Sequence, residues 1–341
     1  MHRVSAGMWR KGGRGATHSA MANQEARVIE LSRARPTVAP KKVRARRVVA
    51  IGGGKGGIGK SMLSANLGIA LARRGAQVVL VDVDLGGANL HTCLGIGQPQ
   101  VTLSDFIDRR VQRLEEVLIP TGYERLSLVS GAMDSLDAAN PHHAQKVKLI
   151  RQLRSFDVDY VVLDLGAGTS FNVLDFFLVA DTGVVVLLPE PTSIENAYRF
   201  IKAAFFRRLQ AAPEDGFAEI IGQALAPRDG APARSPWQVV AELRASNPQK
   251  ANRLERLLSG FHPWIVVNQA RNRPDFDVGP TVAAAWKKFF GLELGYLGAV
   301  SQDDTVWQAV RKRKSLLGAF PECPAASGVL RVAENLIALG G

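Results

Sequence analysis

The sequence lacks long apolar runs: no stretch of about 18 or more uncharged apolar residues occurs, which excludes a membrane-spanning helix. Its basic N-terminal part contains no apolar segment of the kind found in secretory signals, so export is not expected. Cysteine is scarce, and Cys93 and Cys323 stand far apart without a CxxC or zinc-like spacing. We therefore expect two unpaired thiols in a reducing cytoplasm. His142 and His143 have no third ligand at useful spacing, so we expect a surface loop there.

Positive charge is concentrated at the N-terminus. Residues 1–47 hold twelve Lys or Arg and two acidic residues, so this segment carries +10 of the formal charge of +12. We expect a basic, mostly irregular arm with one short helix near residues 23–31. Such an arm could hold DNA, RNA or an anionic membrane surface through phosphate contacts, or it could be a solubilising tail. The sequence leaves both open, and the rest of the chain is nearly neutral.

Short apolar segments alternate with helical patterns from Val48 onward. This alternation is typical of a doubly wound α/β fold, in which a mostly parallel sheet is buried on both faces. The expected strands are residues 48–51, 78–83, 160–163, 184–188, 264–267 and 296–300. The expected helices are residues 60–74, 146–153, 194–209 and 281–290. Residues 210–261 show no strand pattern but contain three helical pieces, at residues 217–225, 236–244 and 250–258. We therefore expect a helical insertion within one domain that spans residues 48–341.

The most informative motif is the segment GGGKGGIGKS at residues 52–61, which follows an expected strand and opens an expected helix. This is the setting of a P-loop, in which glycines let backbone N–H groups surround phosphate oxygens at a helix N-terminus. Lys60 is placed to reach the β- and γ-phosphates, and the Ser61 hydroxyl is placed to ligate Mg²⁺. The sequence therefore predicts a site for a nucleoside triphosphate and Mg²⁺.

A second lysine, Lys55, stands at a position that the ordinary P-loop pattern leaves free. It comes too early to reach its own γ-phosphate beside Lys60, but it could reach across a subunit interface, as an arginine finger does. The motif Lys-Gly-Gly-Ile-Gly-Lys-Ser resembles the deviant Walker A motif of the MinD/ParA family. The resemblance covers residues 48–339 and implies ATP as the nucleotide, a homodimer in the ATP state and slow hydrolysis.

The segment VDVDLGGAN at residues 81–89 resembles the switch I region of that family. The resemblance implies that Asp84 positions the attacking water, that Asp82 lies near Mg²⁺ and that Asn89 belongs to the switch. Alternate residues of a strand share a face, so both carboxylates could meet one ligand. Taken without the family, the pair could also be a helix cap or a turn.

The segment YVVLDLGAG at residues 160–168 resembles the Walker B strand and switch II. An acid at the end of an apolar strand is costly to bury unless it faces water or metal. Asp164 is therefore expected to hold a Mg²⁺-bound water. Gly166 and Gly168 are expected to let the switch move with the γ-phosphate.

Other positions follow from the resemblance alone. Asn268 stands where the family has an adenine-reading asparagine, although it could be a simple turn residue, and Asp303 and Asp304 match the loop that closes over the base. Glu190 aligns with an acid near the dimer face, but a helix N-cap nearby is an equally good interpretation, with Thr192 or Ser193 as the cap. The residues assigned to the nucleotide are Gly54, Lys55, Gly56, Gly57, Ile58, Gly59, Lys60, Ser61, Met62, Asn268 and Asp303.

Within the family, the chain resembles the FlhG/FleN branch of MinD-like regulators of flagellar number and placement. This implies an ATP-dependent dimerising switch that acts as a spatial regulator with a stimulating protein partner. The alternative is a ParA-like ATPase that binds nucleoid DNA for partitioning or cargo positioning. DNA could then contact the arm or the basic cluster at residues 311–314, which could equally be a solvated helix end. A metabolic or iron–sulfur relative is disfavoured, because the two cysteines do not form a symmetric ligand pair.

The chain departs from the family pattern at three places, one of which is the helical stretch at residues 210–261, longer than in typical members. Met62 follows Ser61 where the family has a second hydroxyl residue, which removes one α-phosphate contact. The amphipathic membrane helix that MinD and FlhG relatives carry after the last core helix is not evident, so membrane docking through that end is not expected.

Overall fold

The computed structural model describes residues 47–84, 87–131, 143–211, 213–226 and 233–340. The expected arm, apart from Arg47, lies outside the described residues, as do its helix at residues 23–31 and His142. In the part of the chain that is described, no helix is long and apolar enough to cross a membrane. Cys93 and Cys323 are both free, as predicted.

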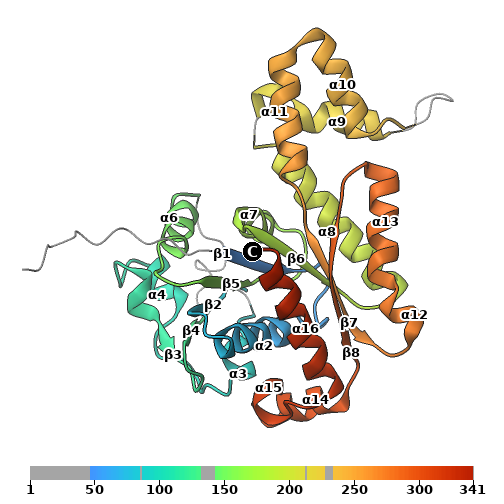
Figure 1. Cartoon of the computed structure of the whole chain (residues 1–341). Helices are drawn as coiled ribbons and strands as arrows, with labels where there is room; N and C mark the ends of the chain where they lie inside the picture. The colour runs from blue at the N-terminus through green and yellow to red at the C-terminus, as the bar shows by residue number, and fades with distance from the viewer. Residues whose placement is uncertain (1–46, 85–86, 132–142, 212, 227–232, 341) are drawn as a thin grey trace, which may run out of the picture. The chain divides into compact units, whose positions relative to one another are not determined.

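One eight-stranded sheet forms the centre of the fold (Figure 1). Its strands are β1 (Arg47–Gly52), β2 (Val78–Asp82), β3 (Ile119–Pro120), β4 (Leu126–Val129), β5 (Tyr160–Asp164), β6 (Thr182–Leu187), β7 (Trp264–Ala270) and β8 (Gly295–Ser301). Their spatial order is β3-β4-β2-β5-β1-β6-β7-β8, and all neighbours are parallel except β3 and β4. The predicted doubly wound, mostly parallel fold is confirmed. The short strands β3 and β4 escaped prediction because they span only two and four residues.

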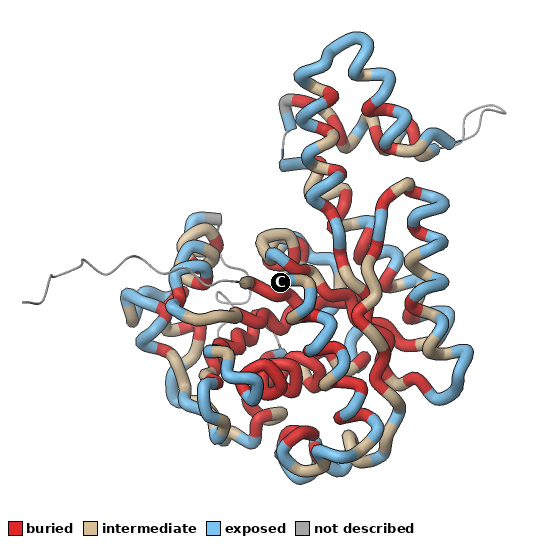
Figure 2. Tube along the Cα trace, viewed as in Figure 1, coloured by how far each residue is buried: buried red, intermediate tan, exposed pale blue. Residues whose placement is uncertain are grey.

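Helices cover both faces of the sheet, so the central strands are largely buried, whereas β3 and β8 at the two edges are partly accessible (Figure 2). Along β1, Val48 and Ala50 join one apolar cluster while Val49 and Ile51 join the other, as the two-residue period of a strand requires. One face packs against α2 (Lys60–Arg73), α3 (Leu90–Cys93), α15 (Leu316–Ala319) and α16 (Pro324–Ala338). The other packs against α4 (Leu103–Ile107), η1 (Leu114–Val117), α6 (His143–Leu153), α7 (Phe171–Val179), α8 (Pro191–Leu209) and α13 (Val278–Phe290).

Two helix starts differ from the sequence interpretation. His143 begins α6, so the expected surface loop is wrong for this residue. Glu190 is the N-cap of α8 and Pro191 follows it, because proline suits the first helical position. Neither Thr192 nor Ser193 is the cap; the Ser193 hydroxyl instead accepts a hydrogen bond from the Leu188 N–H at 2.9 Å.

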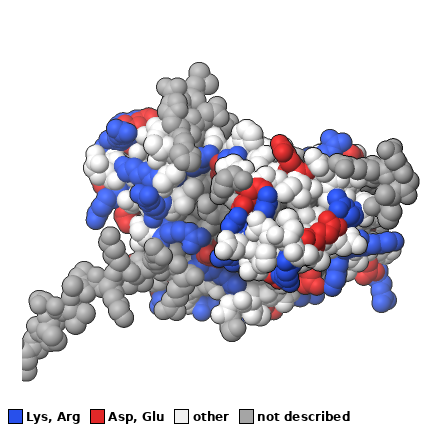
Figure 3. Space-filling model, turned by 90° about the horizontal axis from the view of Figure 1, so that it is seen from above, with Lys and Arg blue, Asp and Glu red and all other residues white. Residues whose placement is uncertain are grey.

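Three helices lie between α8 and β7: α9 (Phe217–Leu225), α10 (Pro236–Ser246) and α11 (Pro248–Ser259), preceded by the short η2 (Pro213–Asp215). The described residues of this segment contain no strand. Phe217 and Leu254 pack into the same apolar cluster as Phe205 of α8. Its outer surface carries paired charges, and Figure 3 shows Lys and Arg beside Asp and Glu on this face. The division into an arm and one ATPase domain with an insertion stays a prediction.

The order of the strands places a crevice beside β1. The chain moves from β1 to β2 on one side, returns to β5, and then continues with β6 on the other side of β1. Ligands of open α/β sheets bind at such a reversal, outside the carboxyl ends of the strands. The segment after β1 is the glycine-rich loop, so the topology puts this loop at the expected crevice.

Candidate functional site

The glycine-rich loop is hydrogen-bonded to β7, a strand that comes much later in the chain. The Asn268 side-chain nitrogen, on β7, donates a hydrogen bond to the Ile58 carbonyl at 2.8 Å. Gly59 has φ +89°, and a Cβ there would come within 2.2 Å of the same nitrogen. A side chain at Gly59 would therefore meet both backbone strain and a clash.

The other side of the loop packs against α8 and the segment after β5. A Cβ on Gly54 would lie 2.1 Å from the Asn196 carbonyl oxygen of α8, so this approach requires glycine. The Gly168 N–H donates to the Gly53 carbonyl at 3.3 Å. Gly56 is exposed and faces Ala167, which puts the predicted switch II segment directly beside the loop.

The two lysines of the loop lie in different environments. Lys60 is only 8% exposed, and its ammonium donates to the Lys55 carbonyl at 3.3 Å. Burial lowers the pKa of Lys60, while the nearby carboxylates of Asp164 and Asp84 act in the opposite direction. The Lys55 side chain is exposed and forms no ion pair with the described residues. The Lys60 side chain is thus buried at the loop, whereas the Lys55 side chain faces solvent.

Two carboxylates meet at the ends of neighbouring strands. Asp82 and Asp164 are register partners on β2 and β5, and both are almost completely buried. Burial, reinforced by the charge of Asp164, raises the pKa of Asp82 to about 8. Burial also raises the pKa of Asp164 to about 6, although hydrogen bonds from Ser61 and Ser64 oppose this. Adjacent buried acids of this kind need a cation for both to ionise.

Two carboxylates are enough for a Mg²⁺ site, but they are too few for a metal site built from protein ligands alone. Mg²⁺ commonly takes one or two carboxylates and completes its shell with phosphate oxygens and water. Ser61 and Asp164 would hold it from the protein side. The Asp82 oxygens accept hydrogen bonds from the Asp84 and Leu90 N–H groups at 3.1 and 3.0 Å, so Asp82 also caps the turn. No cluster of three or more His, Cys, Asp or Glu occurs among the described residues.

The predicted switch residues lie around this pair. Asp84 is half-exposed, and its carboxylate is 3.1 Å from the point where Gly166 would carry a Cβ. The absence of a side chain at Gly166 therefore leaves room for Asp84. Asn89 is exposed, and its side-chain nitrogen donates to the Gly87 carbonyl at 2.7 Å. Glu190 is exposed at the start of α8 without a side-chain capping bond, and its dimer role stays a prediction.

A cleft of about 410 Å³ opens from the loop towards α14 (Asp304–Arg311). Its lining joins the loop, the ends of β7 and β8, and α14, and comprises Gly57, Gly59, Met62, Asn268, Gln269, Ser301, Gln302, Asp303, Asp304, Val306, Trp307 and Val310. Asp303 is the N-cap of α14 and accepts from the Thr305 N–H at 2.9 Å. Asn268, Asp303 and Met62, predicted to bind nucleotide, thus share one cleft.

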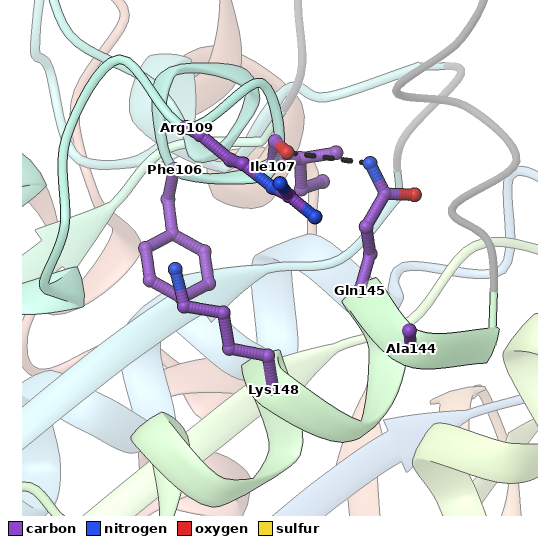
Figure 4. Close-up of a pocket in the computed structure, with 6 residues that line it drawn as sticks. All are labelled: Phe106, Ile107, Arg109, Ala144, Gln145 and Lys148. Atoms are coloured by element: carbon purple, nitrogen blue, oxygen red, sulfur yellow. Dashed lines mark hydrogen bonds between the residues drawn. The ribbon is translucent and has the colours of Figure 1, made fainter.

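A second hollow lies between α4 and α6 (Figure 4). Phe106 forms its floor with the Lys148 ammonium 4.5 Å from the ring centre, and the Gln145 amide donates to the Ile107 carbonyl at 3.3 Å. Its volume is only about 50 Å³, which suits a few waters and not a nucleotide. The cleft beside the loop is the candidate site, because it has room for a nucleotide and is lined by the loop and by residues predicted to bind one.

Sequence reasoning missed several residues of the site. Ser64, one helical turn after Ser61, donates its hydroxyl to Asp164 at 2.9 Å, and its spacing on the helix could have indicated this. Asn196 supports the loop through its backbone, for which the sequence carries no signal. Trp307 lines the cleft, and an exposed aromatic next to the two aspartates of the predicted base loop was an available hint.

Sequence comparisons find similarity to a family of P-loop NTPases and to two bacterial proteins. A ParA family model, described as NUBPL iron-transfer P-loop NTPase, matches residues 44–212. The antiactivator FleN of Pseudomonas aeruginosa is 29% identical over 291 residues, which cover 85% of this chain and 86% of FleN. The flagellum site-determining protein YlxH of Helicobacter pylori is 28% identical over 302 residues, covering 85% and 82% respectively.

Solved structures show the same fold. The cell division ATPase MinD of Pyrococcus furiosus superposes with a TM-score of 0.60 at 21% identity, covering 86% of this chain and 99% of that one. MinD of Pyrococcus horikoshii, complexed with Mg-ADP, gives a TM-score of 0.59 at 21% identity, covering 86% and 97%. At this identity the likeness establishes the fold.

Proposed function

Because the chain belongs to the ParA/MinD family of P-loop NTPases, we propose that it binds and slowly hydrolyses ATP with Mg²⁺ and works as a dimerising positional switch. The type that the relatives support is a spatial regulator of the MinD/FlhG kind. One observation carries the proposal: the buried Lys60 and the Ser61 hydroxyl at the start of α2 meet the Asp164 carboxylate at the end of β5, beside a cleft of nucleotide size.

Each loop residue has a proposed role at the phosphates. The backbone N–H groups of residues 54–61 and the Lys60 ammonium would hold the β- and γ-phosphates. Ser61 and Asp164, with Asp82 behind them, would hold Mg²⁺, which when bound neutralises phosphate charge. Asp84, half-exposed beside Gly166, would orient the attacking water.

Dimerisation would complete the site. Lys55 is exposed at the tip of the loop and its charge is unpaired within the described structure. In the ATP state it would reach the phosphates bound by the partner subunit and stabilise the charge of the transition state. Hydrolysis would remove the γ-phosphate and release the dimer, and a stimulating protein partner would set the rate.

Iron transfer, part of the description of the matching family model, is not proposed for this chain. Burial, together with the charges of Asp164 and Asp82, raises the pKa of the Cys93 thiol to about 12. A thiol must lose its proton to bind iron well. The other cysteine, Cys323, caps α16 by accepting from the Ala326 N–H. Neither thiol is set up as a metal ligand.

The test is the molar mass in solution, measured by light scattering with ADP and then with ATP and Mg²⁺. The wild type should shift from monomer to dimer only with ATP. Lys55→Ala should bind ATP but remain monomeric, whereas Lys288→Ala, which changes an exposed lysine on α13, should dimerise normally. A mass that does not respond to nucleotide in the wild type would refute the switch.

A ParA-like, DNA-associated function is the second candidate, because residues 311–314 are four consecutive exposed cations. None of the four forms an ion pair with another described residue. Such a cluster suits phosphate contacts. DNA retention that needs ATP and falls steeply with salt would favour this candidate, and loss of retention when Lys312 and Lys314 become alanine would locate the contact.

A further inference from the structure

Trp307 is a large aromatic side chain that lies on the wall of the nucleotide cleft and is 60% exposed. We propose that its indole ring is the platform on which the nucleotide base stacks. The inference rests on the proposed ATP site and adds the residue that would hold the base. The loop residues explain binding of the phosphates, but none of them offers a flat apolar surface.

The cleft has the chemical character that a purine requires. The part of its lining that α14 supplies comprises three apolar side chains, Val306, Trp307 and Val310, beyond Asp304 at the start of the helix. Asn268 and Gln302 supply polar groups. A purine has apolar faces and a polar edge, so it needs one flat apolar wall and a few hydrogen-bonding groups. The cleft also begins at the phosphate loop, so phosphates held there direct the base towards α14.

The helix that carries Trp307 is held in place. The Asp303 carboxylate accepts from the Thr305 N–H at 2.9 Å and from the Ala325 N–H of α16 at 3.4 Å, which ties the start of α14 to its neighbour. Ala309 is buried on the inner face of α14. The platform is therefore attached to a fixed element.

The ring itself is restrained but accessible. The Arg311 guanidinium, one turn further along α14, lies 4.6 Å from the ring centre. A cation over an aromatic ring is attracted by the ring electrons and limits side-chain rotation. More than half of the indole nevertheless remains exposed, which is unfavourable for an apolar group until something covers it. Other strongly exposed aromatics, Phe171 and Phe289, do not line this cleft.

The test compares a ligand that has a base with one that lacks it. Binding of ATP and of tripolyphosphate, each with Mg²⁺, is measured by calorimetry on the full chain. Trp307→Ala should weaken the affinity for ATP by about 5- to 150-fold, the range found when stacking aromatics are removed, and leave the affinity for tripolyphosphate unchanged. Trp307→Phe should keep most of the ATP affinity. Phe289→Ala, which removes a similarly exposed aromatic outside the cleft, should change neither affinity.

Intrinsic fluorescence gives a second readout. ATP should change the tryptophan emission of the wild type, and Trp307→Phe should abolish that change while still binding ATP. Equal losses for both ligands in Trp307→Ala, or unchanged ATP binding, would overturn the base platform alone. A wild type that binds neither ligand would overturn the proposed function together with it.

Discussion

At the residue scale, Gly59 shows how closely the phosphate loop is built against β7. Its φ of +89° lies in the left-handed region, and the Asn268 amide fills the space where a Cβ would stand. Gly57, two residues earlier, has φ +74° but nothing within 4 Å of its Cβ position. A side chain at Gly57 would therefore meet backbone strain alone, whereas one at Gly59 would meet both strain and a steric clash.

We expect Gly59→Ala to lower the free energy of unfolding by about 2–5 kcal/mol, because left-handed strain adds to overpacking. Gly57→Ala should cost only about 1–2 kcal/mol, from the strain alone. Urea unfolding of both variants checks this. ATP binding, measured in parallel, should fall further in Gly59→Ala, since the loop must move away from Asn268. Equal losses of stability would contradict the clash.

At the element scale, Asp175 joins three helices. Its carboxylate on α7 accepts hydrogen bonds from Lys146 of α6 and, at 2.8 Å, from Arg207 of α8. Burial raises the pKa of Asp175, but the hydrogen bonds and charges of Arg207 and Lys146 outweigh it, so the net pKa is lowered. Because α7 begins just after the predicted switch II segment, this network holds in place the helix that follows that segment.

Asp175→Asn should lower the free energy of unfolding by about 1–3 kcal/mol at pH 7, since charged hydrogen bonds are lost. A carboxyl with a lowered folded-state pKa stabilises the fold above its unfolded pKa of about 3.9, and this contribution disappears as the pH falls through the folded value. The difference from wild type should therefore shrink below about pH 4. Urea unfolding at pH 7 and pH 3.5 measures it.

The matched control is Asp108→Asn, which removes an acid from a more exposed pair with Arg110. Exposed pairs contribute little, so this variant should lose less than about 1 kcal/mol. If the difference in unfolding free energy between wild type and Asp175→Asn is the same at both pH values, packing and not charge holds α7 in place.

At the scale of the whole molecule, ligand binding should be visible as stability. A ligand that binds only the folded state at about 100 times its Kd stabilises it by roughly 2.7 kcal/mol. The residues proposed to hold ATP and Mg²⁺ come from the loop after β1 and from α2, β2, β5, β7 and α14, so ligand binding ties together much of the fold.

We expect ATP with Mg²⁺ to raise the Tm by several degrees, and ATP with EDTA to raise it less. Asp164→Asn should keep the EDTA response but lose the increment due to Mg²⁺, because a carboxylate that would hold the ion is gone. Asp108→Asn should keep the full increment. Thermal unfolding followed by circular dichroism tests this, and an unchanged increment in Asp164→Asn would remove that residue from the metal site.

The sequence alone determined the fold class and the phosphate loop. Both depend on local patterns: apolar strands recur between helices, and the ten residues 52–61 contain the entire loop motif, placed between an apolar strand and a helix. Short patterns were insufficient to predict the strands β3 and β4. At His143 and Glu190 the local pattern favoured a different start for the helices α6 and α8.

Only the tertiary structure decided which distant residues meet. Asn268 supports a loop residue 210 positions away, and Trp307 enters the same cleft from α14. Asp82 and Asp164 become neighbours because β2 and β5 pair in register. These contacts depend on the order of strands in the sheet and on how closely the helices pack against it. A local pattern carries no information on either, because many packings satisfy the same run of apolar residues.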